Sequence, residues 1–410
     1  MAIANPVNSQ IRFKRQSAKG TLAGATGAQI LRRESATFTL KKDTYDTESE
    51  INSTQQLGSV RHGVRQVDGK VNGFFSPGTY SDFMSAIVRR DFAAVTAVTG
   101  ASVTIAGAGP TYTVTRAAGS YLTDGFKIGM VILLSAGTLN AANINRNLLI
   151  TNVTALVATV MPVNGANGVA MVAEGPVTGT TITAVGKVTY APTTGHTNVY
   201  YTAETWDPDV PSSERNQDVK ISQINLSLPG SGNAKIDVTA VGLDQTSSAS
   251  AYFTSPTAET TTGVLVAASG LLLLAGSPVA TVTDLSINID GKESPAEGVV
   301  GSNIRPDIFR GIVKVSGSFS AYFDSRTLAD TFVDETAQSL IGVFTSDSTN
   351  NADFASFYLP SLVVTSSDGD DGAAKGKKRS YSFTCQYNAA GGAALASPQT
   401  TIQIQDSAAP

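Results

Sequence analysis

The sequence predicts a mainly β protein, and three observations support that prediction. Short runs of alternating apolar and polar residues recur, glycine accounts for 38 of 410 residues, and aromatic residues make up only 7%. Alternation with a period of two places one face of a strand against a core, and glycine-rich intervals mark turns between strands. We expect two tandem β-sandwich or half-barrel domains, each with a short flanking helix, and a small β-barrel or sandwich domain inserted into the first.

The composition disfavours several functional classes. Charged residues are 15% of the chain and the formal net charge is −4, which is atypical of a polybasic nucleic-acid binder or a highly charged disordered chain. One cysteine excludes a disulfide framework, and two histidines leave few groups for metal binding or acid–base chemistry. We therefore expect neither an enzyme nor a cofactor or metal site.

No targeting or membrane segment is expected. The N-terminus lacks a basic start followed by an apolar run, so a secretory signal is not predicted. The most apolar stretch, Gly263 to Gly276, is shorter than the roughly 20 residues that span a bilayer and is typical of a buried strand pair. The protein is expected to remain in the cytosol where it is made, or to leave by a route that needs no signal, with no membrane partner.

The first predicted domain starts with residues 1–92. A strand signal leads into a polar stretch, Lys41 to Ser59, which is long enough to suggest a loop with a function. Strand character returns over Arg65 to Ser76, and Ser81 is placed to cap a helix that runs to about Arg90.

Residues 93–198 form the predicted insertion, a segment rich in Thr, Val, Ala and Gly. Its six charged residues are Arg116, Asp124, Lys127, Arg146, Glu174 and Lys187. Alternating runs and glycine turns predict a small β-barrel or sandwich. The insertion is interpreted as a decoration on the outside. Because its two ends are expected to lie close together, its deletion should leave assembly largely intact.

The first domain resumes over residues 199–250 with a clear hairpin. Ile224, Leu226 and Leu228 alternate with polar residues, a Pro-Gly-Ser-Gly-Asn turn follows, and the alternation then returns. The second predicted domain occupies residues 251–410.

A repeat at a spacing of about 245 residues links the two predicted domains. Val71 to Ser76 and Val315 to Ser320 share four identities in six positions. Each run follows an alternating strand and a long polar loop, and each precedes an amphipathic helix, which in the second copy shows Leu328 and Phe332. The shared order predicts a tandem duplication, and chance matching between β-rich segments is the alternative.

The repeated strands carry a polar face that is a candidate lining for a channel. Val71, Gly73 and Phe75 fall on one face, which suits a core beneath the helix. The lumen-facing candidates on the other face are Lys70, Asn72, Ser76, Lys314, Ser316 and Ser318. The alternative is an ordinary sheet with one solvated side.

Two long polar loops, Lys41 to Ser59 and Asp290 to Pro306, are candidates for contacts between subunits. The residues selected in them are Thr47, Glu48, Glu50, Glu293, Glu297 and Arg305. A sheet can satisfy an exposed edge by pairing it with a neighbour, which would join subunits into a closed ring. A mobile surface loop is the alternative in each case.

No catalytic motif emerges from the sequence. There is no phosphate-binding loop and no Gly-x-Ser-x-Gly elbow, and His62 and His196 occur in unrelated contexts. Cys385 falls on the apolar phase of its strand, which predicts a buried, inert thiol. The acidic run from Asp368 to Gly372 lacks the distal carboxylate of a calcium loop and is more typical of a solvated hairpin tip.

Five runs of sequence carry a resemblance to a known family. They are residues 61–73, 76–83, 124–131, 140–143 and 150–154. In these runs the chain resembles the major tail tube proteins of long-tailed, non-contractile (siphophage-type) bacteriophages. The resemblance implies a structural virion protein of the phage tail, assembled in the host cytoplasm, whose stacked rings form a hollow tube through which DNA is ejected.

The resemblance also implies partners. The first is the chain itself: relatives with one tube domain close a ring with six chains, so a duplicated chain would need three, in a homotrimeric, pseudo-hexameric ring. A homohexamer is expected if the chain is not duplicated. The tape measure protein and phage genomic DNA are expected in the lumen, and tail terminator and distal tail proteins at the ends of the tube.

Two other functions fit the same composition. One is another self-assembling, β-rich virion or surface-layer protein, such as a capsid decoration subunit. The other is a carbohydrate-binding adhesin that uses the inserted domain, although a low aromatic content disfavours stacking on sugars.

Overall fold

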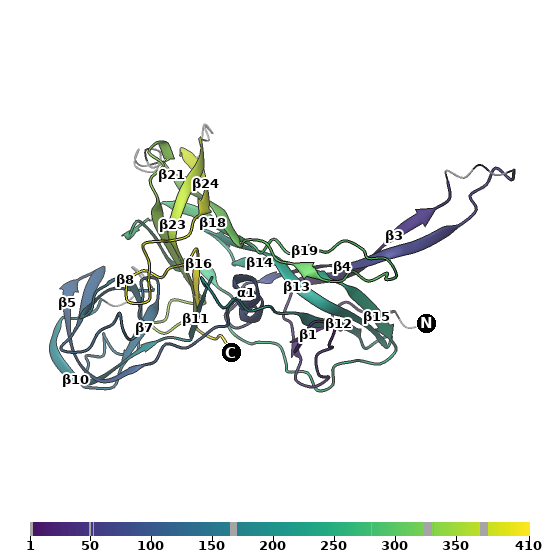
Figure 1. Ribbon diagram of the computed structural model, residues 1–410. Coiled ribbons are helices and arrows are strands. Elements are labelled where there is room, and N and C mark those ends of the chain that lie inside the picture. Colours follow the sequence, from purple (N-terminus) through teal and green to yellow (C-terminus); the bar gives the residue numbers. More distant parts are fainter. Residues whose placement is uncertain are drawn as a thin grey trace.

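The computed structural model describes the chain except residues 1–2, 49–50, 52, 165–169, 280, 324–329, 331 and 370–375, and the side chains of 267–269. The fold is mainly β, as predicted, with large sheets and a separate closed barrel (Figure 1). In the described part of the chain no helix is long and apolar enough to cross a membrane.

The first sheet unit consists of six main strands in two layers. The outer layer pairs β1 with β12, and β12 with the first half of β13; the inner layer runs β3–β4–β14 and ends on the second half of β13. The long strand β13 therefore belongs to both layers. The bounds are β1 Gln10–Arg15, β3 Ser35–Asp46, β4 Val60–Phe74, β12 Tyr201–Asp207, β13 Ser212–Pro229 and β14 Lys235–Gly242, with short strands β2 Gln29–Ile30 and β15 Asp244–Ser248.

The second sheet unit repeats this pairing order. Its outer layer pairs β16 with β22, and β22 with the first half of β23, and its inner layer runs β18–β21–β24–β23. The bounds are β16 Val266–Leu274, β18 Val282–Asp290, β21 Lys314–Tyr322, β22 Gln338–Thr345, β23 Phe354–Gly369 and β24 Lys378–Cys385, with short strands β17 Ser277–Pro278, β19 Ser294–Pro295, β20 Ile308–Phe309 and β25 Gln403–Asp406.

The hydrogen-bonded register aligns the two units differently from the sequence match. Each unit has a one-residue bulge in the equivalent hairpin, between Ile221 and Gln223 in β13 and between Val364 and Ser366 in β23. Counting from these bulges superposes Gly69 on Gly317, because Gly69 pairs with Ala240 next to the first bulge and Gly317 pairs with Phe383 next to the second. The sequence match at Gly73 was thus four residues out of register.

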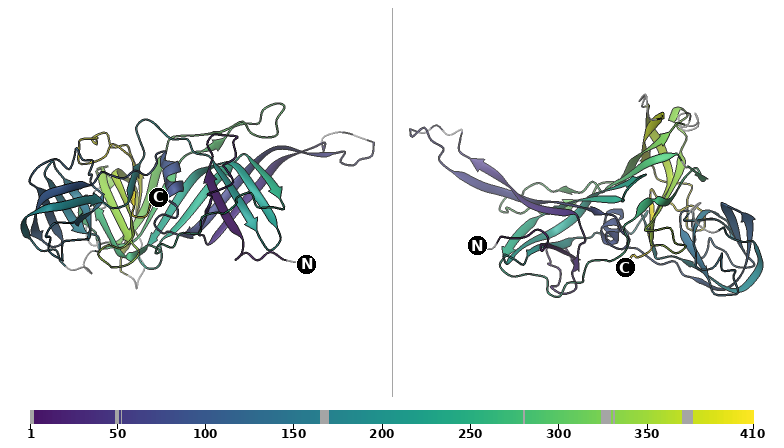
Figure 2. Two further views of the ribbon diagram at one scale, coloured as in Figure 1. Left: turned by 90° about the horizontal axis from the view of Figure 1, so that it is seen from below. Right: turned by 180° about the vertical axis from the view of Figure 1, so that it is seen from behind.

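The two units join in one continuous sheet. The second half of β13 pairs with β18 from Gln223↔Asp290 to Pro229↔Asp284. The inner layers therefore run without interruption as β3–β4–β14–β13–β18–β21–β24–β23, which Figure 2 shows from two further sides.

The helix α1, Ser81–Val88, fills the space between the layers of the first unit. Phe83, Met84, Ile87 and Val88 are buried in the main core, and the Phe83 ring lies 4.6 Å from that of Phe13. Ser81 is the first helical residue rather than the cap; its hydroxyl donates to the buried Asp406 carboxylate at 2.5 Å. The helix flanking the second unit was predicted around Leu328, which lies outside the described residues.

The insertion contains a closed barrel with its own core, one of the two forms predicted for it. The strand order is β10–β5–β6–β9–β8–β7, and the interior is packed with residues such as Val103, Ile132, Leu148 and Val160. The bounds are β5 Val98–Ala108, β6 Thr111–Arg116, β7 Val131–Ser135, β8 Asn147–Val153, β9 Val157–Pro162 and β10 Glu174–Ala184, followed by β11 Lys187–Tyr190.

The barrel is packed against the second unit over a mixed apolar and polar contact. A cluster of buried side chains joins the two: Val131, Leu149, Met161, Val163, Leu273, Ile341, Val343, Phe354 and Tyr358. Gln405 of β25 binds the barrel backbone at Val131 and Val185, with hydrogen bonds of 2.7–2.9 Å. Ala93 pairs with Val188, and in addition to its own core the barrel shares a cluster of buried side chains with the second unit.

Candidate assembly surface

The open face of the continuous inner sheet is mostly polar, with Phe74, Val241 and Val363 as apolar exceptions. In one cross-strand row, Asn72 faces Asp237, followed in turn by Asn225, Asn288, Ser316 and Thr384. Residues directly opposite in an antiparallel sheet point to the same face. The other face carries the apolar residues of the main core, such as Ile236, Leu226 and Ile287, so the sheet has one packed and one polar side.

Charges of both signs are interleaved on this polar face. Lys41 and Asp68 form an ion pair at 2.5 Å on exposed neighbouring strands. Burial tends to raise the pKa of the Asp68 carboxyl, but hydrogen bonds from Lys41 and Gln66 hold that pKa below its usual value. Asp290 lies directly opposite Lys314 on the next strand. The described residues of this face therefore present no block of positive charge to a polyanion.

The structure brings five of the six lumen-facing candidates onto this one face. Lys70 and Asn72 lie on it in β4, and Lys314, Ser316 and Ser318 lie on it in β21.

Ser76 differs from the other candidates. It lies beyond the end of β4, is fully buried, and its hydroxyl is 2.7 Å from that of Thr79. Ser76 is buried in the turn before α1. The strand alternation that placed it on the polar face stops at Phe74. Ser76 is therefore not on the polar face.

Two edges of the inner sheet lack a strand partner among the described residues. β3 pairs only with β4, on one side. The last part of β23, from Val363 to Gly369, pairs only with β24. The equivalent part of β13 is paired on both sides, with β14 and with β18. Among the described residues, the second unit thus ends on a strand edge without a partner, whereas the equivalent edge of the first unit is paired with β18.

The β3–β4 hairpin extends well beyond the sheet as a long arm (Figure 1). Pairing continues to Asp46↔Val60, so the predicted polar loop from Lys41 is strand up to Asp46 and only residues 47–59 connect the strands. Thr47 accepts a hydrogen bond from the Ser59 backbone at 3.2 Å, and Glu48 is exposed. Glu50 lies outside the described residues.

The corresponding segment of the second unit, residues 291–313, folds back onto the first unit. The Glu293 carboxylate lies 3.4 Å from Arg89 and 3.5 Å from Lys220, and side-chain exposure of all three is at most 10%. Burial raises the pKa of Glu293 despite these two cations, and burial lowers the pKa of Lys220. Asp307 accepts a hydrogen bond from the Tyr200 hydroxyl at 2.7 Å. An ionic cluster within one chain therefore holds this segment in place.

The three candidates from this segment consequently differ in their environments. Glu293 is part of the buried cluster, and Arg305 donates a 2.7 Å hydrogen bond to the Ala296 carbonyl within its own segment. Glu297 is exposed. Sequence reasoning missed Arg89 and Lys220 because the cluster draws on three distant segments; the only local signal was an apolar strand interrupted by a lysine at position 220.

Comparison with protein families shows what the chain is. A family model described as phage tail tube protein matches residues 6–387, and the chain belongs to that family. Comparison with curated proteins gives no match. The protein is therefore a structural component of the bacteriophage virion, located in the tail, where members of the family assemble into a tube with other tail proteins.

Proposed function

We propose that three copies of this chain close a ring of six sheet units, and that stacked rings form the tail tube through which DNA is ejected. The single observation that carries the proposal is the β13–β18 junction within the chain. It shows one unit presenting the edge of its inner sheet to the first inner strand of the next. The same junction between chains would pair β23 of one copy with β3 of its neighbour.

The two units define the register expected at this second junction. With Ile221 superposed on Val364 at the bulges, Asn225 corresponds to Asp368 and Leu226 to Gly369. With Gly69 superposed on Gly317, Asn288 corresponds to Thr39 and Ile287 to Phe38. Since Asn225 pairs with Asn288 within the chain, Asp368 should pair with Thr39 of the neighbouring chain.

A closed ring of this kind turns the polar face toward the axis. Ser, Thr and Asn side chains with balanced charges offer few strong contacts to phosphate, and DNA affinity rises with the number of Lys and Arg contacts. We propose Lys70, Asn72, Lys314, Ser316 and Ser318 as lumen residues. During assembly the same lumen would hold the tape measure protein, and terminator and distal tail proteins would close the two ends.

The arm is proposed to reach the neighbouring chain. In the superposition of the two units, residues 42–65 of the first unit correspond to residues 291–313 of the second. Residues 291–313 cover the adjacent unit within the chain. The arm carries the exposed apolar side chains Tyr45, Ile51 and Leu57, which would become buried on a neighbour. Thr47 and Glu48 would lie in this contact.

Cysteine cross-linking tests both the register and the number of chains. Oxidised tubes of a Thr39→Cys/Asp368→Cys variant should give a ladder of one, two and three chains on a non-reducing gel, because opposed strand positions meet disulfide geometry. Burial raises the pKa of Cys385 to about 12, so the native thiol should not compete.

Two control variants sharpen this experiment. Asn225→Cys/Asn288→Cys places the same pair within one chain and should cross-link without joining chains. Leu40→Cys/Asp368→Cys is one residue out of register, with side chains on opposite faces, and should cross-link poorly. A ladder that continues to six chains would contradict the three-chain ring, and equal cross-linking of the two Asp368 variants would contradict the register.

A further inference from the structure

The segment at residues 291–313 contains a counterpart of the hairpin that forms the arm. The two pairs of β19–β20 superpose on the last two pairs of the arm: Ser294↔Phe309 on Tyr45↔Arg61, and Pro295↔Ile308 on Asp46↔Val60. The same superposition places Ile287 on Phe38 and Gly317 on Gly69 in the inner sheet. The two elements are therefore equivalent at their bases, but one is folded onto the adjacent unit and the other projects from the molecule (Figure 1).

Within the chain, part of this segment covers the base of the arm. The Arg65 backbone N–H donates to the Asn303 carbonyl at 3.0 Å, and Arg65 forms a parallel bridge with Ile304. The Gly298 backbone lies close to Val64, because a Cβ at Gly298 would be 2.7 Å from the Val64 Cγ2. Val64 is half-buried in this contact. Residues 298–304 thus form a cover over this end of β4.

The same position on the second unit has no such cover among the described residues. Ile312 superposes on Val64 and is 87% exposed, and the nearby Phe309 is 63% exposed. We call these two residues and Val313, the counterpart of Arg65, the arm seat. Two large apolar side chains that are exposed this close together, at a position covered in the other unit, indicate a contact surface.

The chemistry of the arm and of the arm seat changes together. Glu293 of the segment superposes on Thr44 of the arm, and Lys220, which binds Glu293, superposes on Val363. The arm also carries Tyr45, which is 58% exposed. A buried carboxylate without its cation would be costly, so the charge has to be absent from both sides of a contact or present on both. An arm lying on this seat would therefore make an apolar contact where the segment makes an ionic one.

We propose that the arm of each chain lies on the arm seat of the neighbouring chain, as residues 298–304 lie on the first unit within a chain. This inference rests on the proposed ring and names the surface that receives the arm. Counting back from β4 and β21, Gln56 superposes on Ile304 and should therefore lie beside Val313 of the neighbour. The ring would then alternate between ionic joints within chains and apolar joints between chains.

Photo-cross-linking identifies what lies on the arm seat. An Ile312→benzoylphenylalanine variant is assembled into tubes and irradiated, and the adduct is located by mass spectrometry. We expect a two-chain product joined to residues 47–59 of the second chain. The reciprocal Gln56→benzoylphenylalanine variant should label residues 308–313. No adduct between chains, or adducts only to other parts of a neighbouring chain, would overturn the proposal.

The Thr39→Cys/Asp368→Cys background separates this inference from the ring itself. In oxidised tubes, a photo-cross-link within the ring leaves three chains as the largest product, whereas a seat occupied by a chain of the next ring would give larger products and overturn the proposal. The disulfide ladder without the arm adduct would overturn the arm seat and leave the ring in place. The arm adduct without the ladder would overturn the ring and leave the contact between arm and seat.

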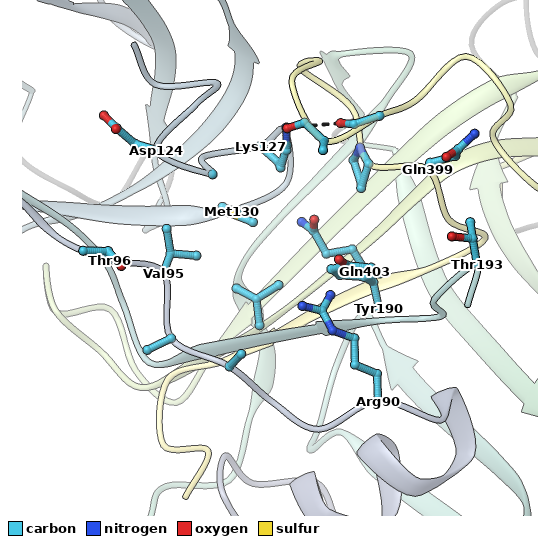
Figure 3. A pocket seen from close by; sticks show the side chains of 17 residues that line it. Arg90, Val95, Thr96, Asp124, Lys127, Met130, Tyr190, Thr193, Gln399 and Gln403 are labelled. Carbon is cyan, nitrogen blue, oxygen red and sulfur yellow. Dashed lines mark hydrogen bonds between the residues drawn. The ribbon is translucent and has the colours of Figure 1, made fainter. Parts of the chain in front are cut away.

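A charge placed on the arm seat tests whether the contact matters for assembly. Ile312→Asp should leave the thermal midpoint of the single chain unchanged, because the side chain is exposed there. It should lower the sedimenting tube fraction at least tenfold, because a carboxylate would be buried in an apolar contact. Leu156→Asp, in an exposed turn of the barrel, and Thr96→Asp, beside a cavity between the barrel and the C-terminal segment (Figure 3), should assemble like wild type. Tubes of Ile312→Asp as abundant as those of these two controls would contradict the proposal.

Discussion

At the scale of single residues, the Arg89–Lys220–Glu293 cluster holds the 291–313 segment of the second unit against the first unit. One carboxylate is shared between two buried cations, one from the residue directly after α1 and one from β13. A buried ion pair gives little net stability compared with an apolar replacement, yet removing one partner leaves uncompensated charge. The cluster therefore adds little net stability when it is intact, but the loss of one member would leave buried charge without a counter-ion.

Glu293→Ala should destabilise the chain by about 3–5 kcal/mol, because two buried cations lose their counter-ion. Urea unfolding followed by tryptophan fluorescence measures the change. Glu297→Ala, at an exposed position of the same segment, should stay within about 0.5 kcal/mol of wild type. A Glu293→Ala variant as stable as the Glu297→Ala control would contradict a structural role for the cluster.

At the scale of elements, alternating patterns located the strands that have one buried face. The hairpin of β13 and β14 was predicted with its turn, because Ile224 and Leu226 face Val238 and Ile236 in the core. The outer half of β3 was missed, because the arm leaves the body and residues 41–46 have no buried face. Polar residues on both sides of a strand give no alternation to detect.

The repeat was detected from the sequence, but its alignment was shifted by four residues. The sequence around β4 contains Val-x-Gly twice, at Val67–Gly69 and at Val71–Gly73. Either copy matches Val315–Gly317. Only strand pairing distinguishes them, since the bulges place Gly69 opposite the residue equivalent to Phe383. A shift of four residues preserves the face of each side chain, so the error in register does not change which face of β4 and β21 each residue lies on.

Replacing residues 47–59 with a two-residue Asn-Gly turn should leave the monomer folded and abolish tubes. Pairing of β3 with β4 ends at Asp46↔Val60, so the hairpin can close there. Circular dichroism reports the fold and negative-stain microscopy reports the tubes. A second variant replaces residues 47–59 with a Gly/Ser stretch of the same length, which separates the effect of arm length from that of its side chains. Abundant tubes from the short-turn variant would show that this part of the arm is not needed for assembly.

At the scale of the whole molecule, the barrel and the second unit share a core, which changes the expectation for the insertion. From the sequence, the insertion was expected to decorate the outside and to be dispensable for assembly, because composition and boundaries indicate only that its ends lie close together. The shared cluster of Leu273, Ile341, Val343, Phe354 and Tyr358 depends on contacts between distant segments. No local pattern shows that the outer side of β22 is covered.

Deleting residues 94–187 should therefore destabilise the protein, since each fully buried large apolar side chain that becomes exposed costs roughly 1.5–3 kcal/mol. Thermal unfolding should show a lower midpoint and aggregation of the deletion variant. Gly129→Ala offers a milder test, because a Cβ at Gly129 would lie 2.5 Å from that of Tyr358. A deletion variant that melts like the intact chain would contradict the shared core.

The covalent link between β13 and β18 has a kinetic consequence for assembly. Every second seam of the proposed ring forms during folding of a single polypeptide, at the high effective concentration that a tether provides. Only two bimolecular encounters and one ring closure then remain per ring, instead of five encounters and one closure. The tandem arrangement thus reduces the bimolecular steps from five to two. It also leaves each newly made chain with only one donor edge and one acceptor edge to protect from wrong associations.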